Sequence, residues 1–191
     1  DYTQALGHLR KTVELAPGEA TAHYHVAATY LEMGRFSEAE QELRSSIELQ
    51  PTAAALHTLG TALMYQKQDA DALPYFARAL QVNPRMYAAC MYLGIAYRRL
   101  GRSAEARAAL QRGLDLAEVD MGRNPRSGYV RSFLAYFAAS LGNRNRAESE
   151  AAQALQLSPD DTDARWTAIL TYEALGRRDS TLSVIGTSPA G

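Results

Sequence analysis

Histidine, the side chain proteins use most often to bind metals, occurs four times in the chain. His23 and His25 are two residues apart, and two residues on a helix are separated by about 200°, so both cannot bind one ion. His25 and His57 could approach each other on adjacent helices, but no cysteine or carboxylate completes that pair. We therefore predict no metal site and no cofactor.

Carboxylates, which can act as general acids and bases, gather at two places. Glu38, Glu40 and Glu42 belong to an exposed helix face, and Asp160 and Asp161 follow a proline at a helix entry, where capping explains them. Acid–base catalysis needs a pocket, which the sequence does not indicate, and it holds no phosphate-binding glycine loop, nucleophile elbow or HExxH motif. We predict no catalytic residues and no enzymatic activity.

The composition favours helices over strands. The chain has 34 Ala but only 10 Val and Ile together, and strands are rich in the latter two. Its single cysteine, Cys90, excludes an intrachain disulfide and occupies a position that we expect to face the core as an inert thiol.

The sequence repeats with a period near 34 residues. Prolines show the period first: Pro17, Pro51, Pro84, Pro125 and Pro159 are separated by 34, 33, 41 and 34 residues. Glycines and alanines report the same period and the same long interval: Gly34, Gly101, Gly142 and Gly176; Ala39, Ala72, Ala106 and Ala147. Because three residue types recur with the same period, the sequence indicates a repeat architecture.

Each repeat is predicted to be a pair of helices. Rows that start at residues 20, 53, 87, 128 and 162, each start counted as repeat position 1, align apolar residues at helical spacings of 3 and 4. Small residues at positions 8 and 20 let the two helices approach closely. The recurring glycines end the first helix in a left-handed conformation, and Lys67 takes that place in the second complete row, so we expect strain there.

The long interval is one period plus seven residues, or about two helical turns, which lengthens a helix without rotating its faces. Leu110, Leu114 and Ala117 continue one apolar stripe. We predict an unusually long helix from about Ala104 to about Met121, and about eleven helices in total with no strand.

The pattern resembles the tetratricopeptide repeat family, as in the segments AHYHVAATYLEMGRFSEAEQELRSSIELQP and AACMYLGIAYRRLGRSAEARAALQRGLDL. This resemblance implies an all-α, right-handed superhelical solenoid of antiparallel helix pairs. The expected array spans 1–191: a partial repeat 1–19, then 20–52, 53–86, 87–127 with the seven-residue extension, 128–161 and a truncated 162–191. The sequence departs from the family at Lys67 and Thr181, and at Arg131 and Arg165, where a large apolar residue is usual.

In this family the first helix of each pair lines a concave groove that binds peptides or protein segments. Tyr and Trp with Arg are typical of binding hot spots, although we expect about half of the groove residues to serve helix packing. The predicted groove residues are Tyr24, His57, Tyr65, Tyr92, Arg98, Arg99, Tyr129, Phe133, Tyr136 and Trp166. We expect a partner that is apolar or aromatic with some acidic character. The carboxylate clamp of chaperone-binding members lacks its residues here, with Tyr24, Thr58 and Tyr92 among those in its place.

Charge excludes a strongly basic nucleic-acid binder, because 20 basic residues face 21 acidic ones. Residues 98–146 contain ten Arg and four acidic residues. We interpret this basic excess as a solvated surface. The alternatives are a patch that recognises carboxylate or phosphate groups, and a patch that binds nucleic acid. The sequence shows no apolar run of the length of a membrane span and no secretory leader, so we expect a cytoplasmic protein without membrane insertion.

The sequence thus predicts a non-catalytic scaffold for protein interactions. The alternative is a regulatory or sensing region of a larger bacterial enzyme such as a serine/threonine kinase, whose repeat regions the closing segment YEALGRRDSTLSVIGTSPAG faintly resembles. The chain starts inside a second helix with an apolar face of Ala5, Leu9 and Val13, so we expect a fragment of a larger protein, with self-association possible through this open N-terminal end.

Overall fold

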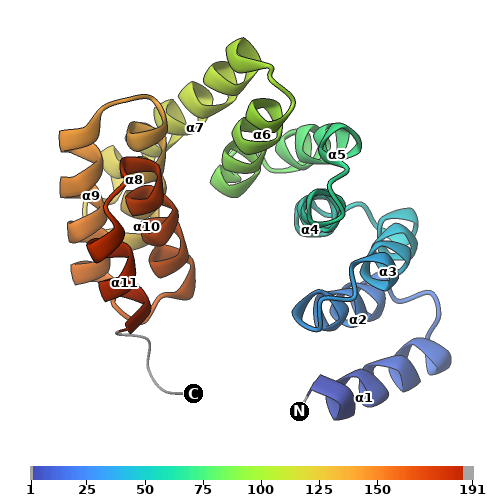
Figure 1. Ribbon diagram of the computed structural model, residues 1–191. Helices are drawn as coiled ribbons and strands as arrows, with labels where there is room; N and C mark the ends of the chain where they lie inside the picture. Colours follow the sequence, from blue (N-terminus) through green and yellow to red (C-terminus); the bar gives the residue numbers. More distant parts are fainter. Residues whose placement is uncertain (1, 187–191) are drawn as a thin grey trace. The chain divides into compact units, whose positions relative to one another are not determined.

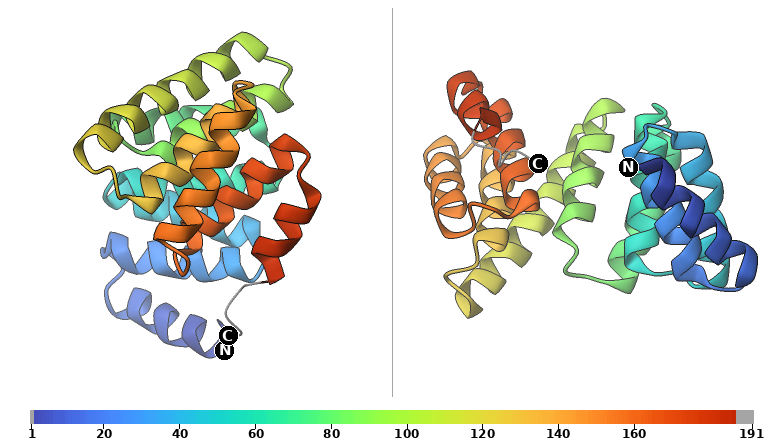
Figure 2. Two further views of the ribbon diagram at one scale, coloured as in Figure 1. Left: turned by 90° about the vertical axis from the view of Figure 1, so that its left-hand side faces the viewer. Right: turned by 90° about the horizontal axis from the view of Figure 1, so that it is seen from below.

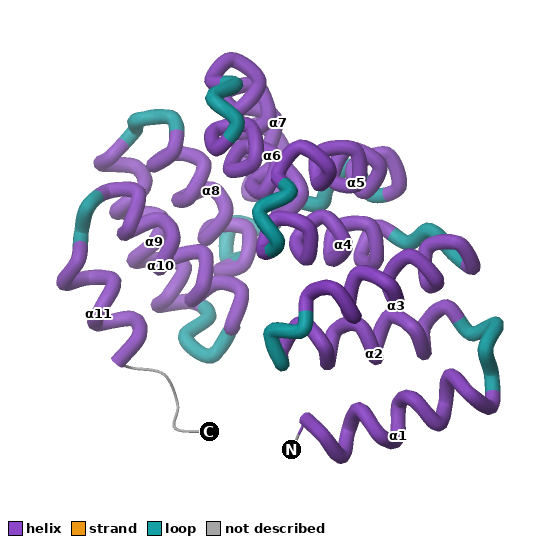
Figure 3. Tube along the Cα trace, turned by 45° about the vertical axis from the view of Figure 1, so that its right-hand side comes forward, coloured by secondary structure: helices purple, strands orange, loops and turns teal. Residues whose placement is uncertain are grey.

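The computed structural model describes residues 2–186, which form helices joined by short turns and contain no strand (Figure 3). Within this range the eleven helices are α1 (Tyr2–Leu15), α2 (Ala20–Glu32), α3 (Phe36–Leu49), α4 (Ala53–Tyr65), α5 (Asp69–Val82), α6 (Tyr87–Arg99), α7 (Ser103–Arg123), α8 (Gly128–Ser140), α9 (Arg144–Leu157), α10 (Thr162–Leu175) and α11 (Arg178–Gly186) (Figure 1). The predicted all-α fold of helix pairs is confirmed. Residue 1 and the last five residues of the predicted repeat 162–191 lie outside the described range.

The helices form two compact units, unit 1 with residues 1–103 and unit 2 with residues 104–191. Within each unit the two helices of a repeat pack together: α2 on α3, α4 on α5, α8 on α9 and α10 on α11 (Figure 2). First helices also contact the next first helix, since α4 touches α2 and α6, and α10 touches α8. The first helices therefore form a face in each unit, made of α2, α4 and α6 in unit 1 and of α8 and α10 in unit 2.

The turns between paired helices have the left-handed backbone that the recurring glycines predict. Gly34, Gly101, Gly142 and Gly176 all have positive φ. Lys67, at the same place in its repeat, also has a φ of 62° and is the one non-glycine residue with positive φ in the described range. A side chain with a Cβ disfavours this region, so the predicted strain is located at Lys67.

Small residues let the paired helices approach, as predicted for repeat position 8. A Cβ on Gly60 would lie 2.7 Å from the ring of Phe76, which is fully buried on α5. The same device holds α7 against α8, where a Cβ on Gly113 would lie 2.3 Å from the ring of Phe137. These rings fill the space that a larger residue would need.

Helix α7 is the predicted long helix. It has 21 residues, whereas the other helices have 14 or fewer. Leu110 and Ala117 are buried along it and Leu114 is partly buried, so the apolar stripe continues through the extension. In the extended part Glu118 accepts a 2.6 Å hydrogen bond from Arg146 Nη1 of α9.

The two arginines that depart from the family pattern form a recurring clamp at repeat position 4. Arg165 donates to the carbonyl oxygens of Pro159, at 3.3 Å, and Val184, at 2.5 Å. Arg131 donates to the carbonyl of Pro125 at 2.8 Å and forms an ion pair with Glu150 of α9.

His23 occupies the same repeat position and makes equivalent contacts. Its Nε2 lies 3.2 Å from the carbonyl oxygen of Pro17, and its Nδ1 lies 2.7 Å from Glu42 Oε2 of α3. In all three cases a polar side chain ties the preceding proline turn to the second helix of its own repeat. The guanidinium groups of Arg131 and Arg165 thus have specific polar partners, whereas Arg131 Nε is buried without one.

Helix α1 packs against α2 through one of its sides. Leu6 is the buried residue, Leu9 and Val13 are partly buried, and Ala5 is exposed. The predicted apolar face of Ala5, Leu9 and Val13 is thus only partly covered. The physical reason is that α1 packs only on α2, so only the side toward α2 is covered.

Candidate functional site

The first-helix face of unit 1 carries six of the predicted groove residues. They are Tyr24 on α2, His57 and Tyr65 on α4, and Tyr92, Arg98 and Arg99 on α6. Because α4 contacts both α2 and α6, the three helices present these side chains on neighbouring elements.

His57 and Tyr92 form an aromatic cluster with Phe76, which the second helix α5 contributes. The His57 ring centroid lies 5.2 Å from that of Tyr92 and 5.6 Å from that of Phe76, and the Phe76 and Tyr92 rings stack at 5.6 Å. Burial lowers the pKa of His57 to about 4, and its Nε2 is buried without a hydrogen-bond partner. His57 is therefore a neutral imidazole at neutral pH, and its surroundings are those of a packing residue.

Tyr65 is the most accessible aromatic residue of this face. It is 55% exposed and stacks on Phe36 of the preceding second helix, with ring centroids 4.8 Å apart. Arg99 occupies the equivalent place one repeat later and pairs with Asp69 of α5 at 3.2 Å. Sequence reasoning missed Phe36 because it looked for groove residues on first helices only.

The edge of unit 1 thus presents an aromatic stack at one repeat and a guanidinium at the next. Arg98, beside Arg99 at the end of α6, is exposed as well. Tyr24 is partly buried and makes an edge-on contact with His25, with centroids 5.6 Å apart.

The first-helix face of unit 2 splits the other four predicted residues into two classes. Trp166 is 48% exposed and Tyr129 is 37% exposed. Phe133 and Tyr136 are only 3% and 4% exposed, so they offer little surface to a partner. Their rings pack around Phe137 at 6.3 and 6.0 Å, which makes them part of the core of α8.

The acidic residues near Tyr129 and Trp166 were not predicted as site residues. Asp163 lies one turn before Trp166 on α10. Burial, and then the charges of Asp163 and Asp161, raise the pKa of Tyr129. Asp161 caps α10 as predicted, because its carboxylate accepts from the backbone N–H of Ala164 at 2.8 Å.

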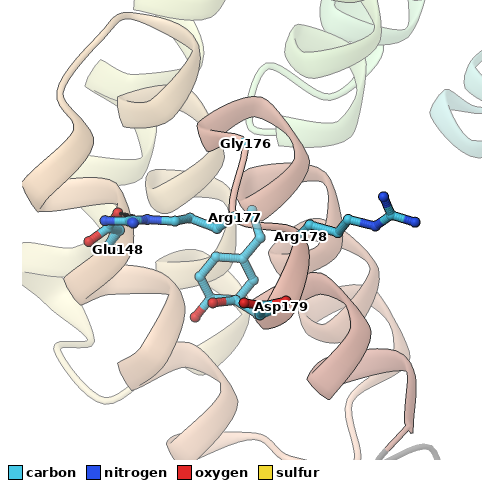
Figure 4. A pocket seen from close by; sticks show the side chains of 7 residues that line it. Glu148, Gly176, Arg177, Arg178 and Asp179 are labelled. Carbon is cyan, nitrogen blue, oxygen red and sulfur yellow. Dashed lines mark hydrogen bonds and ion pairs between the residues drawn. The ribbon is translucent and has the colours of Figure 1, made fainter.

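A surface pocket of about 510 Å³ lies in unit 2, where the turn after α10 leads into α11. Its lining residues are Glu148, Tyr172, Gly176, Arg177, Arg178, Asp179 and Ser180. Figure 4 shows Arg177 reaching toward Glu148, whereas Arg178 points the opposite way. Arg177 Nε donates to Glu148 Oε1 at 2.6 Å.

Glu148, Arg177 and Tyr172 in this pocket have shifted pKa values. The hydrogen bond from Arg177 lowers the pKa of Glu148, and the same contact raises the pKa of Arg177. Burial, and then the Glu148 charge, raise the pKa of Tyr172. All three shifts lead away from neutrality, whereas an acid–base catalyst needs a pKa near the working pH.

Residues 2–186 contain neither a candidate metal cluster nor a membrane-spanning helix. No cluster of three or more His, Cys, Asp or Glu side chains is arranged to hold a metal ion in this range. None of the helices in this part of the chain has the length and apolar character needed to cross a membrane.

The repeat pattern and the helix pairs agree with known family models. Two models, both describing the tetratricopeptide repeat, match residues 1–63 and residues 57–120. The chain belongs to the tetratricopeptide repeat family. No curated protein matches the sequence.

Solved structures share the fold, and two of them are described as tetratricopeptide repeat (TPR) proteins. A thermophilic TPR protein of Thermus thermophilus is 25% identical, with a TM-score of 0.65, and the match covers 91% of this chain and 90% of that one. YrrB, described as a TPR protein with an unusual peptide-binding site, is 21% identical with a TM-score of 0.55, covering 93% and 89%. PilF of Pseudomonas aeruginosa is 21% identical with a TM-score of 0.62, covering 96% and 81%.

Proposed function

We propose that this chain is a non-catalytic scaffold whose first-helix faces bind a peptide or protein segment of a partner. The observation that carries the proposal is that the face of unit 1 presents both an aromatic ring, Tyr65 stacked on Phe36, and two exposed guanidinium groups, those of Arg98 and Arg99. Exposed aromatic and Arg side chains are the residue types that contribute most to protein binding. The peptide-binding site described for YrrB supports the same use of this fold.

The unit 1 face favours a segment with an apolar or aromatic side chain and an acidic group. Tyr65 offers a ring that is already held in place by Phe36, so little side-chain entropy is lost when a partner stacks on it. Arg98 and Arg99 can form charge-assisted hydrogen bonds with a carboxylate. Arg99 already shares its charge with Asp69, so a partner carboxylate would compete with that exposed pair.

The test is a selection of binding peptides from a random displayed library with the whole chain as bait, followed by titration of the selected peptide. Tyr65→Ala and Arg99→Ala should each weaken binding by about 1 kcal/mol or more, roughly fivefold. Arg107→Ala is the matched control, because Arg107 is exposed on the second helix α7. Equal losses in all three variants would show that the first-helix face is not the binding surface.

The ten predicted groove residues do not contribute equally to this proposal. Tyr65, Arg98, Arg99, Tyr129 and Trp166 have accessible side chains and carry it. The aromatic cluster around Phe76 and the buried rings of α8 hold the helices that present them.

A further inference from the structure

Helix α10 exposes a stripe with an acid at each end and apolar side chains between. The stripe consists of Asp163, Trp166, Leu170 and Glu173, at spacings of 3, 4 and 3, which place all four on one side of the helix. Trp166 is 48% exposed, Leu170 is partly exposed, and both acids are exposed. Helices α8, α9 and α11 pack on α10 but leave this stripe accessible.

The basic residues of the two first helices in unit 2 point away from the stripe. Helix α8 has only Arg131 and helix α10 has only Arg165. Arg131 is held by Glu150 and by the carbonyl of Pro125, and Arg165 is held by two backbone carbonyls. The clamps at repeat position 4 therefore engage the basic side chains of α8 and α10 with partners other than the two carboxylates of the stripe.

An indole between two carboxylates is a site for a cation. The face of Trp attracts a guanidinium or ammonium group more strongly than that of Tyr or Phe. Asp163 lies one turn from Trp166, close enough for one guanidinium to contact both the ring and the carboxylate. Glu173 offers a second carboxylate ten residues along the helix from Asp163, a rise of about 15 Å.

We propose that the α10 stripe binds an extended segment carrying two basic residues about four positions apart, with an apolar residue between them. An extended chain covers about 15 Å in four to five residues, so its two cations can reach the two carboxylates. The apolar residue then lies over Leu170 and the Trp166 ring. This inference rests on the proposed function, since it names the partner chemistry for the unit 2 face.

Trp166 is the chain's only tryptophan, so its fluorescence reports directly on the stripe. The probes are two synthetic peptides with the core Ala-Leu-Ala, one flanked by two arginines and the other by two glutamates. The arginine peptide should shift the Trp166 emission to saturation and bind roughly tenfold or more tightly than the glutamate peptide. Its affinity should fall as NaCl rises from about 50 mM to about 300 mM.

Variants locate the binding and separate it from folding. The double variant Asp163→Asn/Glu173→Gln should lose about tenfold in affinity for the arginine peptide. Asp163→Glu, which keeps the charge, should retain most of it. Glu48→Gln, an exposed acid on α3 in unit 1, should leave the affinity unchanged. Circular dichroism of each variant confirms that the helices are intact.

Three outcomes would overturn the inference. The first is equal binding of the glutamate peptide, and the second is full affinity in the double variant. The third is an emission shift that grows with protein concentration in the absence of peptide, because a second copy would then occupy the stripe. The proposed function would survive all three if peptides selected from a random library still bind and still depend on Tyr65 and Arg99.

Discussion

The second complete repeat, residues 53–86, and the fourth, residues 128–161, have the same arrangement of two helices, but apolar side chains stabilise the one where charged side chains stabilise the other. At repeat position 4 the second repeat has Leu56, fully buried in the core. The fourth repeat has Arg131 there, paired with Glu150. The side chains of this ion pair are only 15% and 17% exposed, so a largely buried ion pair takes the place of the apolar contact that Leu56 makes in the second repeat.

Two further equivalent positions differ in the same way. At position 5 the second repeat has His57, held neutral among aromatic rings, whereas the fourth has Ser132, whose hydroxyl donates to the carbonyl of Tyr129 at 2.8 Å. At the turn the second repeat has Lys67 and the fourth has Gly142.

The comparison shows that the repeat fixes geometry and leaves the means of stabilisation open. An apolar side chain at position 4 needs only packing, because it has no group to satisfy. A charged one needs a partner on the second helix and a carbonyl in the preceding turn, and the fourth repeat supplies both. Each solution depends on residues that the other repeat lacks, so substitutions should affect the two repeats differently.

The largest effect is expected when the ion pair of the fourth repeat is broken on one side only. Arg131→Leu leaves the Glu150 carboxylate in a mostly buried place without its partner and removes a donor from the carbonyl of Pro125. We expect the free energy of unfolding to fall by about 3 kcal/mol. Urea unfolding monitored by circular dichroism measures it.

The matched control converts the fourth repeat to the pattern of the second. Tyr75 occupies the place of Glu150 in the second repeat, 19 residues after Leu56. Arg131→Leu combined with Glu150→Tyr should therefore recover at least half of the loss, because no buried charge remains. A double variant less stable than Arg131→Leu alone would show that the two repeats are not interchangeable at this position.

The second repeat should lose stability in mild acid because of His57. Its pKa is about 4 in the folded chain and about 6.5 in the unfolded chain, so the unfolded state binds the proton first as the pH falls. The contribution of neutral His57 to the free energy of unfolding is fully present above about pH 6.5 and is lost between about pH 6.5 and about pH 4. From pH 7 to pH 5 this histidine should lower the free energy of unfolding by about 2 kcal/mol.

The check is the same unfolding experiment on His57→Leu, which removes the titrating group and keeps a side chain of similar size. The other three histidines remain, so they contribute equally to both proteins. The difference in stability between parent and variant should change with pH by the amount given above. A difference that is the same at pH 7 and pH 5 would mean that water reaches His57 in the folded chain.

The sequence predicted the helical elements well because each rests on a local rule. The left-handed turn at Lys67 follows from its alignment with the glycines, and the length of α7 follows from seven extra residues that keep the helical phase. The boundary between the two units lies at the start of α7, and no local sequence pattern predicts it.

The candidate site was only partly predictable. Repeat position tells which side of a helix a residue occupies, but not whether a neighbour covers it. Phe133 and Tyr136 occupy groove positions and are nevertheless buried, whereas Trp166 at a groove position is exposed. The charge of the α10 stripe was missed for a different reason, since it depends on Arg131 and Arg165 turning to other partners.

A smaller effect is expected from substituting the turn glycine of the fourth repeat. Gly142 has a φ of 93°, and a Cβ added there would meet no atom within 4 Å. Any loss of stability in Gly142→Val therefore comes from the left-handed backbone conformation rather than from a steric clash of the side chain. We expect destabilisation by more than about 1 kcal/mol, measured as a shift of the denaturation midpoint. Gly142→Asn should lose less, since Asn tolerates left-handed backbone better than a β-branched residue does.

The smallest effect runs in the opposite direction and belongs to the second repeat. Lys67 already has the left-handed backbone that its glycine counterparts adopt, with a φ of 62°, and its side chain is exposed. Lys67→Gly removes the steric cost of the Cβ, about 1 kcal/mol, but also gives the unfolded chain more freedom, which offsets part of the gain. We expect a net stabilisation of about 0.5 kcal/mol and a rise of the unfolding temperature by about 1–2 °C. Lys67→Ala keeps the Cβ and removes the charge, so it separates the backbone effect from loss of the ammonium group. If the alanine variant gains as much as the glycine variant, the turn of the second repeat is limited by charge, and Lys67 and Gly142 do not differ in backbone strain.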